Sequence, residues 1–508
     1  MASALLSLNF AQTAAAAVPD PVVAVTGGQV RGRLLEGGGA IFRGVPFAQP
    51  PTGALRWREP MPVLGWDGVR EADKSGPPSA QPALGWNDDF AAAGSEDCLY
   101  LDVWTPRADS KAGLPVMVWI HGGANVAGAG GFDPLYEGKS LIGHGVVLVV
   151  VEYRLGILGY FAHPELTQES PHHASGNYGI MDQAAALRWV RDNIVRFGGD
   201  PGNVTLFGQS AGSMDVLALM TSPLAKGLFH RAIAESGPSR YYPSAPTLPE
   251  SERAGADAAA KLGAPATGAL PFLRSLPAAA LIRSGPWMLA LTTDGWVLPA
   301  SPAESFAKGR EAPVPLIIGS AAIEFPANGA PEELRASMRT ILGDVAPKAF
   351  GLFGLEKDGA SIAADPLYGN AAEQWGGDMF RCPAIVQGEW HAAAGNATWE
   401  YEFDRAIPPR PKTGHSSDLP YVFGNLLKTG GQGGDFQDAD HRLSAAIQAY
   451  WTNFAKTGNP NGAGVAPWPT HDGKARSYLA FTTSGDEVVL TNQRGQVCDL
   501  FREAMNRP

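Results

Sequence analysis

The chain has 508 residues, of which 45% are hydrophobic and 18% charged, a composition typical of a soluble globular protein with a large core. Its formal net charge of -11 argues against nucleic acid or an anionic membrane surface as the main partner. No stretch reaches the roughly 18 uninterrupted apolar residues of a transmembrane helix, so no membrane anchor is predicted.

The N-terminus reads MASALLSLNFAQTAAAAVPDP, an apolar stretch that is rich in small side chains and ends in an alanine run before Pro19. It resembles the hydrophobic and cleavage regions of a secretory signal peptide, although the positively charged first region is missing. Residues 1–20 are interpreted as the remnant of a leader, with a disordered apolar N-terminus as the alternative. The leader predicts a periplasmic or secreted protein; the alternative location is cytoplasmic.

The first half of the chain predicts strands followed by one long helix. The alternating stretch VTGGQVRGRLL indicates an antiparallel hairpin, and LPVMVWIHGG and GVVLVVVEYRLG are apolar runs typical of strands buried on both faces. In the following segment, GNYGIMDQAAALRWVRDNIVRFGGDP, the apolar residues from Ile180 to Ile194 fall at helical spacing. This helix is expected to end at Gly198 and Gly199.

Further along, NVTLFGQSAG predicts a strand that enters a turn, and SMDVLALMTSP predicts a helix. Two more strands are expected at VPLIIGS and ATWEYEF. Because strands alternate with helices, an α/β sheet is predicted. The stretches 240–310 and 325–390 have a helical and irregular character, and are interpreted as cap-like excursions within one domain that spans residues 21–508.

The segment Gly208-Gln209-Ser210-Ala211-Gly212 places a serine between two glycines, where the expected strand passes into the expected helix. In this context G-x-S-x-G is typical of a nucleophile held on a strained turn. The glycines relieve crowding in the turn, and the N-terminus of the helix favours developing negative charge. Ser210 is therefore the candidate nucleophile, and the alternative is a structural serine in a turn.

Longer segments resemble blocks of one protein family, in that family's order: FRGVPFAQPPTGALRW, SEDCLYLDVWTP, GNYGIMDQAAALRWVRDNIVRFGGDP and WTNFAKTGNPNG. Over nearly all of residues 22–500 the chain resembles the type-B carboxylesterase/lipase family, the cholinesterase-like branch of the α/β-hydrolases, and in particular its bacterial-type carboxylesterases. The resemblance implies an α/β-hydrolase fold, with a large and mostly parallel central sheet flanked by helices. It also implies hydrolysis of a small-molecule ester through an acyl-enzyme, without a cofactor or a metal.

The resemblance further implies that the backbone N–H groups of Gly123, Ala124 and Ala211 form the oxyanion hole. Gly123 and Ala124 lie in VWIHGGANVAG, a glycine-rich turn after a buried strand, where backbone donors can converge because little side-chain bulk intrudes. The family usually has a third glycine at the position of Ala124. A backbone donor survives that change, but the methyl group is expected to narrow the pocket or shift the loop. The alternative is a tight turn without a catalytic role.

The candidate base is His415, because KTGHSSDLPYVFG resembles the catalytic-histidine block of the family. A histidine in a loop between strand and helix suits a base that moves between nucleophile and leaving group. The acid of an α/β-hydrolase lies between the serine and the histidine in sequence. Glu324 fits, five residues after the glycine that ends VPLIIG, although Phe325 follows where the family usually has glycine. Glu311 and Asp294 are fallback candidates for the acid.

Other positions match supporting residues of the family. Ser236 and Asp418 correspond to a polar network behind the triad, and Asp418 is expected to support the loop that carries the base. Gln209 precedes the nucleophile where cholinesterases have glutamate, so a choline ester is not expected as the substrate. The pairs Arg56 with Glu96 and Arg154 with Asp182 resemble buried ion pairs of the family, and they are expected to serve stability.

The three cysteines are Cys98, Cys382 and Cys498, and none of them lies in a CxxC or Cys/His cluster with metal spacing. In many relatives the cysteine at position 98 pairs with one about twenty residues upstream, where this chain offers Ser79. The resemblance therefore implies a free Cys98. It implies a disulfide between Cys382 and Cys498, which would fit an exported protein; the alternative is two buried thiols.

Phe325, Trp287 and Trp375 are interpreted as candidates to line the substrate pocket, and Trp86 as a generic aromatic of the pocket or the surface. The expected substrate is a small to medium ester that is neutral or hydrophobic. The alternatives are a lipase that acts on long-chain acyl esters and, in another class, a non-catalytic cholinesterase-like binding protein. The sequence leaves the natural ester and the oligomeric state open.

Overall fold

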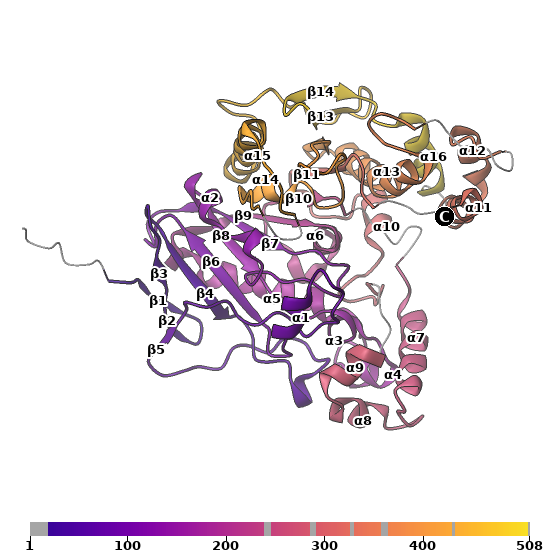
Figure 1. The fold of residues 1–508 in the computed structure, drawn as a ribbon. Helices are drawn as coiled ribbons and strands as arrows, with labels where there is room; N and C mark the ends of the chain where they lie inside the picture. The colour runs from indigo at the N-terminus through magenta and orange to yellow at the C-terminus, as the bar shows by residue number, and fades with distance from the viewer. Residues whose placement is uncertain are drawn as a thin grey trace, which may run out of the picture.

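The fold is organised around a large mixed β-sheet (Figure 1). The computed structural model describes residues 19–237, 245–284, 291–325, 330–356, 364–428 and 432–505. Within them the sheet has eleven strands, which are, in spatial order, β14 (Glu487–Thr491), β13 (Ser477–Phe481), β12 (Thr398–Phe403), β11 (Leu316–Ala321), β10 (Arg231–Glu235), β9 (Gly199–Gln209), β7 (Leu114–Ile120), β8 (Val147–Val151), β6 (Tyr100–Thr105), β4 (Ala40–Pro46) and β3 (Arg33–Leu34).

Neighbouring strands from β13 across to β8 run parallel, and the pairs at the two ends of the sheet are antiparallel. A separate small sheet contains β1 (Val22–Val25), β2 (Gly28–Arg31) and β5 (Val69–Glu71). Strands β1 and β2 pair antiparallel, which confirms the hairpin predicted from alternation. The predicted α/β-hydrolase architecture, with a mostly parallel sheet flanked by helices, is therefore present.

The central strands are apolar on both sides because each face of the sheet packs on its own hydrophobic cluster. In β7, for example, Val118 and Ile120 contribute to one cluster, and Met117 and Trp119 contribute to the other. The first cluster includes side chains of α3 (Gly156–Tyr160), α5 (Tyr178–Asn193) and α6 (Ala211–Thr221), and the second includes those of α2 (Lys139–Gly143), α14 (Leu419–Phe423) and α15 (Asp438–Thr457). Helix α5 confirms the predicted amphipathic helix, and the segment after it ends at Gly198, whose φ is 87°.

A third hydrophobic cluster lies beyond the sheet, on the right in Figure 1. It draws on α11 (Pro331–Leu342), α12 (Ala346–Leu352), α13 (Ala371–Ala393) and α16 (Gly495–Met505). The remaining helices are α1 (Asp88–Ala93), α4 (Pro164–Glu169), α7 (Leu248–Lys261), α8 (Ala269–Ser275), α9 (Ala278–Ser284) and α10 (Pro302–Ala307). In their described residues, the expected excursions at 240–310 and 325–390 thus contain mainly helices. One of them, α13, packs directly on β11 and β12 and belongs to the layer that covers the sheet.

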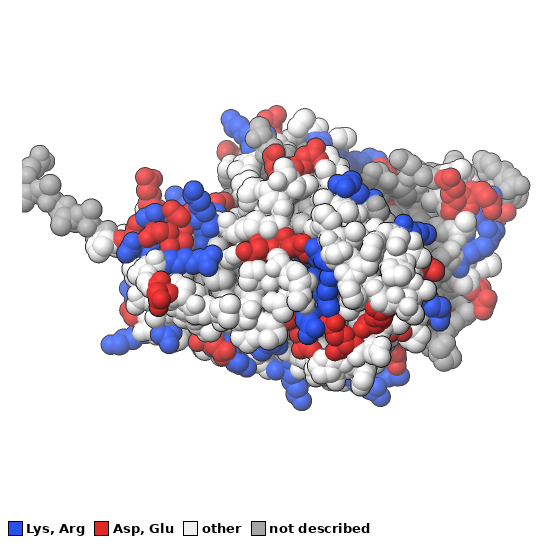
Figure 2. Space-filling view, turned by 90° about the horizontal axis from the view of Figure 1, so that it is seen from below, with Lys and Arg blue, Asp and Glu red and all other residues white. Residues whose placement is uncertain are grey.

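The surface drawn in Figure 2 is largely uncharged, with acidic and basic side chains interspersed across it. Arg31 and Glu71 form one exposed ion pair of the protein, at 2.7 Å. In the part of the chain that the structure describes, no helix is both long and apolar enough to cross a membrane.

Candidate active site

The candidate nucleophile, Ser210, lies on the sharp turn between β9 and α6. Its backbone has φ 57° and ψ -123°, a conformation that costs a residue with a side chain of the order of 1–3 kcal/mol. The flanking glycines are needed because a side chain at either position would clash with the backbone. A Cβ at Gly212 would lie 2.1 Å from the carbonyl oxygen of Ile120, and one at Gly208 would lie 2.7 Å from that oxygen. Packing on both sides therefore holds the strained turn in place.

The candidate acid and base come from the loops that follow two neighbouring parallel strands. Glu324 follows β11, His415 follows β12, and His415 Nδ1 lies 2.5 Å from Glu324 Oε2. The backbone N–H of His415 also donates to the carbonyl of Glu324, at 3.0 Å. The other carboxylate oxygen of Glu324 accepts a hydrogen bond from the N–H of Ala321, at 2.9 Å. The imidazole is therefore held from one side by a buried and fully oriented carboxylate.

The other ring nitrogen of His415 points to the nucleophile turn. His415 Nε2 lies 3.2 Å from Nε2 of Gln209, the residue directly before Ser210. Among the contacts between described residues, none joins His415 to the Ser210 hydroxyl. Catalytic hydrogen bonds are often long in substrate-free enzymes, so an imidazole beside the Ser210 turn is compatible with a role as the base. The three side chains predicted from sequence thus lie at one edge of the sheet.

The candidate oxyanion loop follows β7 and lies directly against the nucleophile turn. A Cβ at Gly122 would lie 3.0 Å from the Cβ of Ser210. Gly123 and Ala124 have φ values of 108° and 59°, so Ala124 occupies a left-handed conformation that favours glycine. Within the described residues, the N–H groups of Gly123, Ala124 and Ala211 have no hydrogen-bond partner. All three are therefore free to donate to a substrate oxygen.

A polar network lies behind the acid and the base. The N–H of Ala321, which holds Glu324, also lies 3.2 Å from Ser236 Oγ. Asp418 is buried beneath the His415 loop, and its Oδ2 accepts a hydrogen bond from the Tyr401 hydroxyl at 3.0 Å. Ser236 and Asp418 are thus placed behind the site, as the sequence predicted.

The sequence did not single out Glu235, a second buried carboxyl in this network. Its Oε1 accepts a hydrogen bond from Trp451 Nε1 at 2.6 Å, while its Oε2 and Asp418 Oδ1 have no partner among the described residues. Burial raises the pKa of both carboxyls, and their mutual repulsion raises that of Glu235 further. The only signal in the sequence was an acidic residue at the end of an apolar strand, directly before Ser236.

Aromatic side chains pack on the candidate base. The ring of Phe325, which is 51% exposed, stacks on His415 with centroids 4.3 Å apart and an angle of 29°. Phe380, on α13, lies 5.3 Å from the same imidazole and 5.6 Å from Phe325. Phe325 therefore lies against the candidate base, while its place in a substrate pocket stays a prediction. Phe380 joins it from a helix that the sequence did not connect with the site.

The prediction that Trp375 lines the substrate pocket is wrong. Its side chain is 1% exposed, and its ring packs between Phe353 and Phe501 in the third hydrophobic cluster. Its indole N–H donates to Ser337 Oγ at 2.9 Å. A buried tryptophan with a satisfied N–H is a core residue. The third pocket candidate, Trp287, lies outside the described residues.

The ion pairs predicted from sequence are both present. Arg56 binds Glu96 through two contacts of 2.6 and 2.7 Å, and Arg154 binds Asp182 through two contacts of 2.7 Å. Both arginines are buried. Removal of one partner of such a pair leaves an isolated charge, which typically costs about 3–5 kcal/mol.

The cysteines are arranged as the resemblance implied. Cys382 and Cys498 form a disulfide that joins α13 to α16. Cys98 is a free and fully buried cysteine that contacts the side chain of Ser79, and burial raises the pKa of its thiol.

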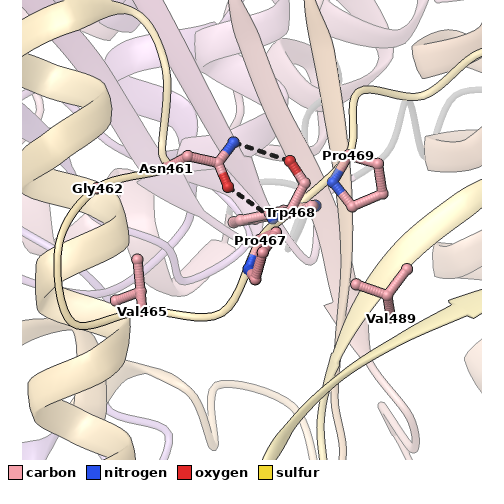
Figure 3. A pocket seen from close by; sticks show the side chains of 7 residues that line it. All are labelled: Asn461, Gly462, Val465, Pro467, Trp468, Pro469 and Val489. Carbon is pink, nitrogen blue, oxygen red and sulfur yellow. Dashed lines mark hydrogen bonds between the residues drawn. The ribbon is translucent and has the colours of Figure 1, made fainter.

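A shallow apolar pocket of about 550 Å³ lies elsewhere, between the loop after α15 and the edge strand β14 (Figure 3). Its walls include Val465, Pro467 and Val489, and the Asn461 side chain bonds the backbone of Trp468. The loop continues to His471, whose N–H bonds the first residue of β12. This pocket therefore lies toward the start of β12, whereas His415 follows its end.

Comparisons with known proteins identify the family of this chain. A model of the carboxylesterase family matches residues 19–337 and 366–500. The chain is 36% identical to the fumonisin B1 esterase of Sphingopyxis macrogoltabida over 472 residues, which cover 89% of this chain and 85% of that protein. It is 34% identical to the liver carboxylesterase of Sus scrofa, with 96% of this chain and 94% of that protein covered.

Solved structures of esterases superimpose on nearly the whole fold. A PNB esterase gives a TM-score of 0.81 at 32% identity, and a carboxylesterase of Geobacillus stearothermophilus gives 0.81 at 31% identity. Each comparison covers 94% of this chain and 99% of the other. The chain therefore belongs to the carboxylesterase family, and it is a carboxylic ester hydrolase with the α/β-hydrolase fold.

Proposed function

We propose that the protein hydrolyses small to medium esters, neutral or hydrophobic, through an acyl-enzyme formed on Ser210. The observation that carries this proposal is the position of His415, which is held by Glu324 on one side and lies beside the Ser210 turn on the other. A nucleophile, an oriented base and an acid within reach of one another are the parts that acyl transfer requires.

In the proposed reaction, His415 takes the proton of Ser210 while Ser210 Oγ attacks the ester carbonyl. Glu324 fixes the imidazole tautomer and stabilises the imidazolium. The N–H groups of Gly123, Ala124 and Ala211 bind the oxyanion, and the loss of one such donor typically costs about 3–4 kcal/mol of transition-state stabilisation. The imidazolium then protonates the leaving alcohol, and water hydrolyses the acyl-enzyme by the same route.

The side chains around His415 support a neutral or hydrophobic ester. Gln209 presents an amide beside the imidazole, so this position offers no negative charge to a cationic substrate. Phe325 and Phe380 add apolar surface on the other side. The names of the relatives, which include a fumonisin B1 esterase and a cocaine esterase, support small-molecule esters as the substrate class.

Residues 21–508 are proposed to act as one catalytic domain. A periplasmic or secreted location is part of the same proposal. It is supported by the disulfide between Cys382 and Cys498, because such bonds persist in oxidising compartments.

The test is the hydrolysis of p-nitrophenyl acetate, butyrate and palmitate by the wild type and by Ser210→Ala. We expect turnover of the short esters, and a loss of at least about 10³-fold in kcat in the variant. A preference for palmitate would identify a lipase. Equal activity of the two proteins would show that Ser210 is not the nucleophile.

A further inference from the structure

Behind the candidate oxyanion loop, a buried hydrogen bond joins two residues that the proposed reaction does not use. Asn125 Nδ2 donates to Asp215 Oδ1 at 2.9 Å, and the two side chains are 3% and 0% exposed. Asn125 directly follows Ala124 in the loop, and Asp215 lies on α6, five residues after Ser210. The bond therefore connects the loop after β7 with α6, the helix that begins directly after Ser210.

This connection matters because the proposed oxyanion hole is assembled from both elements. Gly123 and Ala124 belong to the loop, whereas Ala211 is the first residue of α6. A hydrogen-bonded hole acts only if its donors converge on the position of one oxygen atom, and a misplacement of about 1 Å can cost about 100-fold in rate. The rate of the proposed reaction therefore depends on the position of the loop relative to the helix.

The loop end of the link is itself constrained. Asn125 has φ 58°, its carbonyl accepts the N–H of Gly156 at 2.6 Å, and its Oδ1 lies 3.2 Å from the Tyr153 hydroxyl. The same hydroxyl donates to the carbonyl of His121 at 2.7 Å. Asn125 thus connects the loop with the segment that follows β8 and with the start of α3, as well as with α6.

The helix end is anchored by two further donors. Asp215 Oδ2 accepts hydrogen bonds from Gln183 of α5 at 2.5 Å and from the Tyr160 hydroxyl of α3 at 3.3 Å. Within the described residues, Asp215 has no ion pair with a lysine or an arginine, and burial raises its pKa to about 7. The burial of a carboxyl without a cation costs free energy. The three hydrogen bonds that Asp215 accepts offset part of this cost.

We infer that Asn125 and Asp215 are a pair of positioning residues that fixes the oxyanion loop relative to the nucleophile helix, so that the three backbone donors converge on one oxyanion. The inference rests on the proposed function, because it assigns a task to that oxyanion hole. Loss of the pair is expected to lower kcat and leave KM nearly unchanged, because the hole binds the transition state and not the ground state.

The experiment compares Asn125→Asp with the exchanged pair Asn125→Asp/Asp215→Asn. The single variant replaces the amide donor with a second buried carboxyl that repels Asp215, so at pH 8.5 we expect kcat for p-nitrophenyl butyrate to fall about 10–100-fold with KM changed less than about threefold. The exchange restores one donor opposite one acceptor, so it should recover most of the loss. Asn125→Gly, which tolerates the positive φ, removes the amide and should resemble the single variant.

Gln183→Met is the matched control. It removes a hydrogen bond to the same carboxylate from α5, which does not carry the loop, and it leaves the bond from Asn125 in place. The denaturation midpoint should therefore fall, and kcat should fall clearly less than in the loop variants. A trifluoromethyl ketone, whose adduct carries an oxyanion, should lose affinity in parallel with kcat in the loop variants only.

The inference is overturned if Asn125→Asp and Asn125→Gly lower kcat no more than Gln183→Met does, or if the exchanged pair stays as inactive as the single variant. If Asn125→Asp does not fold, the comparison of Asn125→Gly with Gln183→Met decides the question. An active Ser210→Ala would instead remove the proposed function itself, so the two failures are distinguishable.

Discussion

At the residue scale, the contact between Phe325 and His415 is the feature that departs most from the family pattern. A glycine after the acid would leave one face of the imidazole uncovered, whereas here a phenyl ring stacks on it at 4.3 Å. In the proposed reaction the base becomes positively charged as the ester is attacked, and the face of an aromatic ring attracts a cation. Phe325 is therefore expected to stabilise the positive charge that develops in the transition state.

Replacement of this ring gives a specific prediction. Phe325→Leu keeps an apolar side chain but removes the π face, so kcat for p-nitrophenyl butyrate should fall about 2–5-fold, the equivalent of the roughly 0.5–1 kcal/mol of an exposed cation–π contact. Phe325→Tyr retains the ring and should stay within about 1.5-fold. Steady-state kinetics of the three proteins measure the difference, and a leucine variant as fast as the wild type would assign the ring to packing alone.

How far single residues could be predicted depends on how local their signal is. The place of Ser210 on a turn between strand and helix could be predicted because the strand, the glycines and the helix that define this turn are contiguous in sequence. Trp375 was misjudged because a tryptophan in a core and one in a pocket look alike until the packing partners are known. The link of Asn125 to Asp215 spans 90 positions and depends on one contact, so nothing in the sequence pointed to it.

At the element scale, the central strands were predictable one by one, whereas the segment of helix α13 was predicted only as part of a stretch of helical and irregular character. Strands buried on both faces are continuous apolar runs in the sequence, and this pattern does not depend on the order of the strands in the sheet. The segment of α13 contains Gly376, Gly377 and Pro383, which indicate an irregular structure by local propensity. The helix persists through them because much of its surface is buried against β11, β12 and the third cluster. Tertiary packing thus overrides the local preference.

The disulfide between α13 and α16 leads to the prediction at this scale. It closes a loop of 116 residues, and a constraint of that kind typically stabilises a native state by about 2–4 kcal/mol, mainly by restricting the unfolded chain. Cys382→Ser/Cys498→Ser should therefore unfold at a lower urea concentration than the oxidised wild type. Because neither cysteine is among the candidate catalytic residues, kcat at 25 °C should remain within about twofold.

The wild type treated with a reductant is the matched control for this variant, because it has the same sequence with an open bond. Its urea midpoint should move toward that of the double variant. If oxidised wild type and double variant unfold together, the bond does not contribute to the free energy of unfolding.

At the scale of the whole molecule, buried carboxyls determine how stability responds to pH. Burial raises the pKa of Asp215 to about 7, and raises those of Glu152 and Glu235 well above the ordinary range. Each of these groups keeps its proton in the native state at a pH where the unfolded chain has lost it. The native state then binds more protons, and the free energy of unfolding falls as the pH rises. The stabilisation that these protonated carboxyls give to the native state is fully present below about pH 4, and it is lost as the pH rises through each native pKa.

Three histidines whose pKa is lowered act in the opposite direction, in a lower pH range, whereas the raised pKa of buried His471 adds to the effect of the carboxyls. Burial lowers the pKa of His121 to about 4 and also lowers those of His144 and His163, so these side chains favour the unfolded state only where it binds their protons, below about pH 6.5. Between pH 6.5 and 8 the carboxyls therefore dominate. The free energy of unfolding should decrease over this interval, by at most about 1.4 kcal/mol per pH unit for each carboxyl that stays protonated only in the native state.

Urea unfolding at pH 6.5, 7.2 and 8.0 measures this slope, and Glu152→Gln identifies its origin. Glu152 is buried, and its Oε1 accepts the N–H of Gly130 at 2.6 Å. Among the described residues its Oε2 has no hydrogen-bond partner and lies 3.9 Å from His121 Nε2. A glutamine keeps that acceptor but has no proton to lose, so the variant should have a shallower slope than the wild type and gain stability relative to it as the pH rises. Parallel slopes in the two proteins would mean that Glu152 is already ionised in the native state at pH 6.5, in spite of its burial.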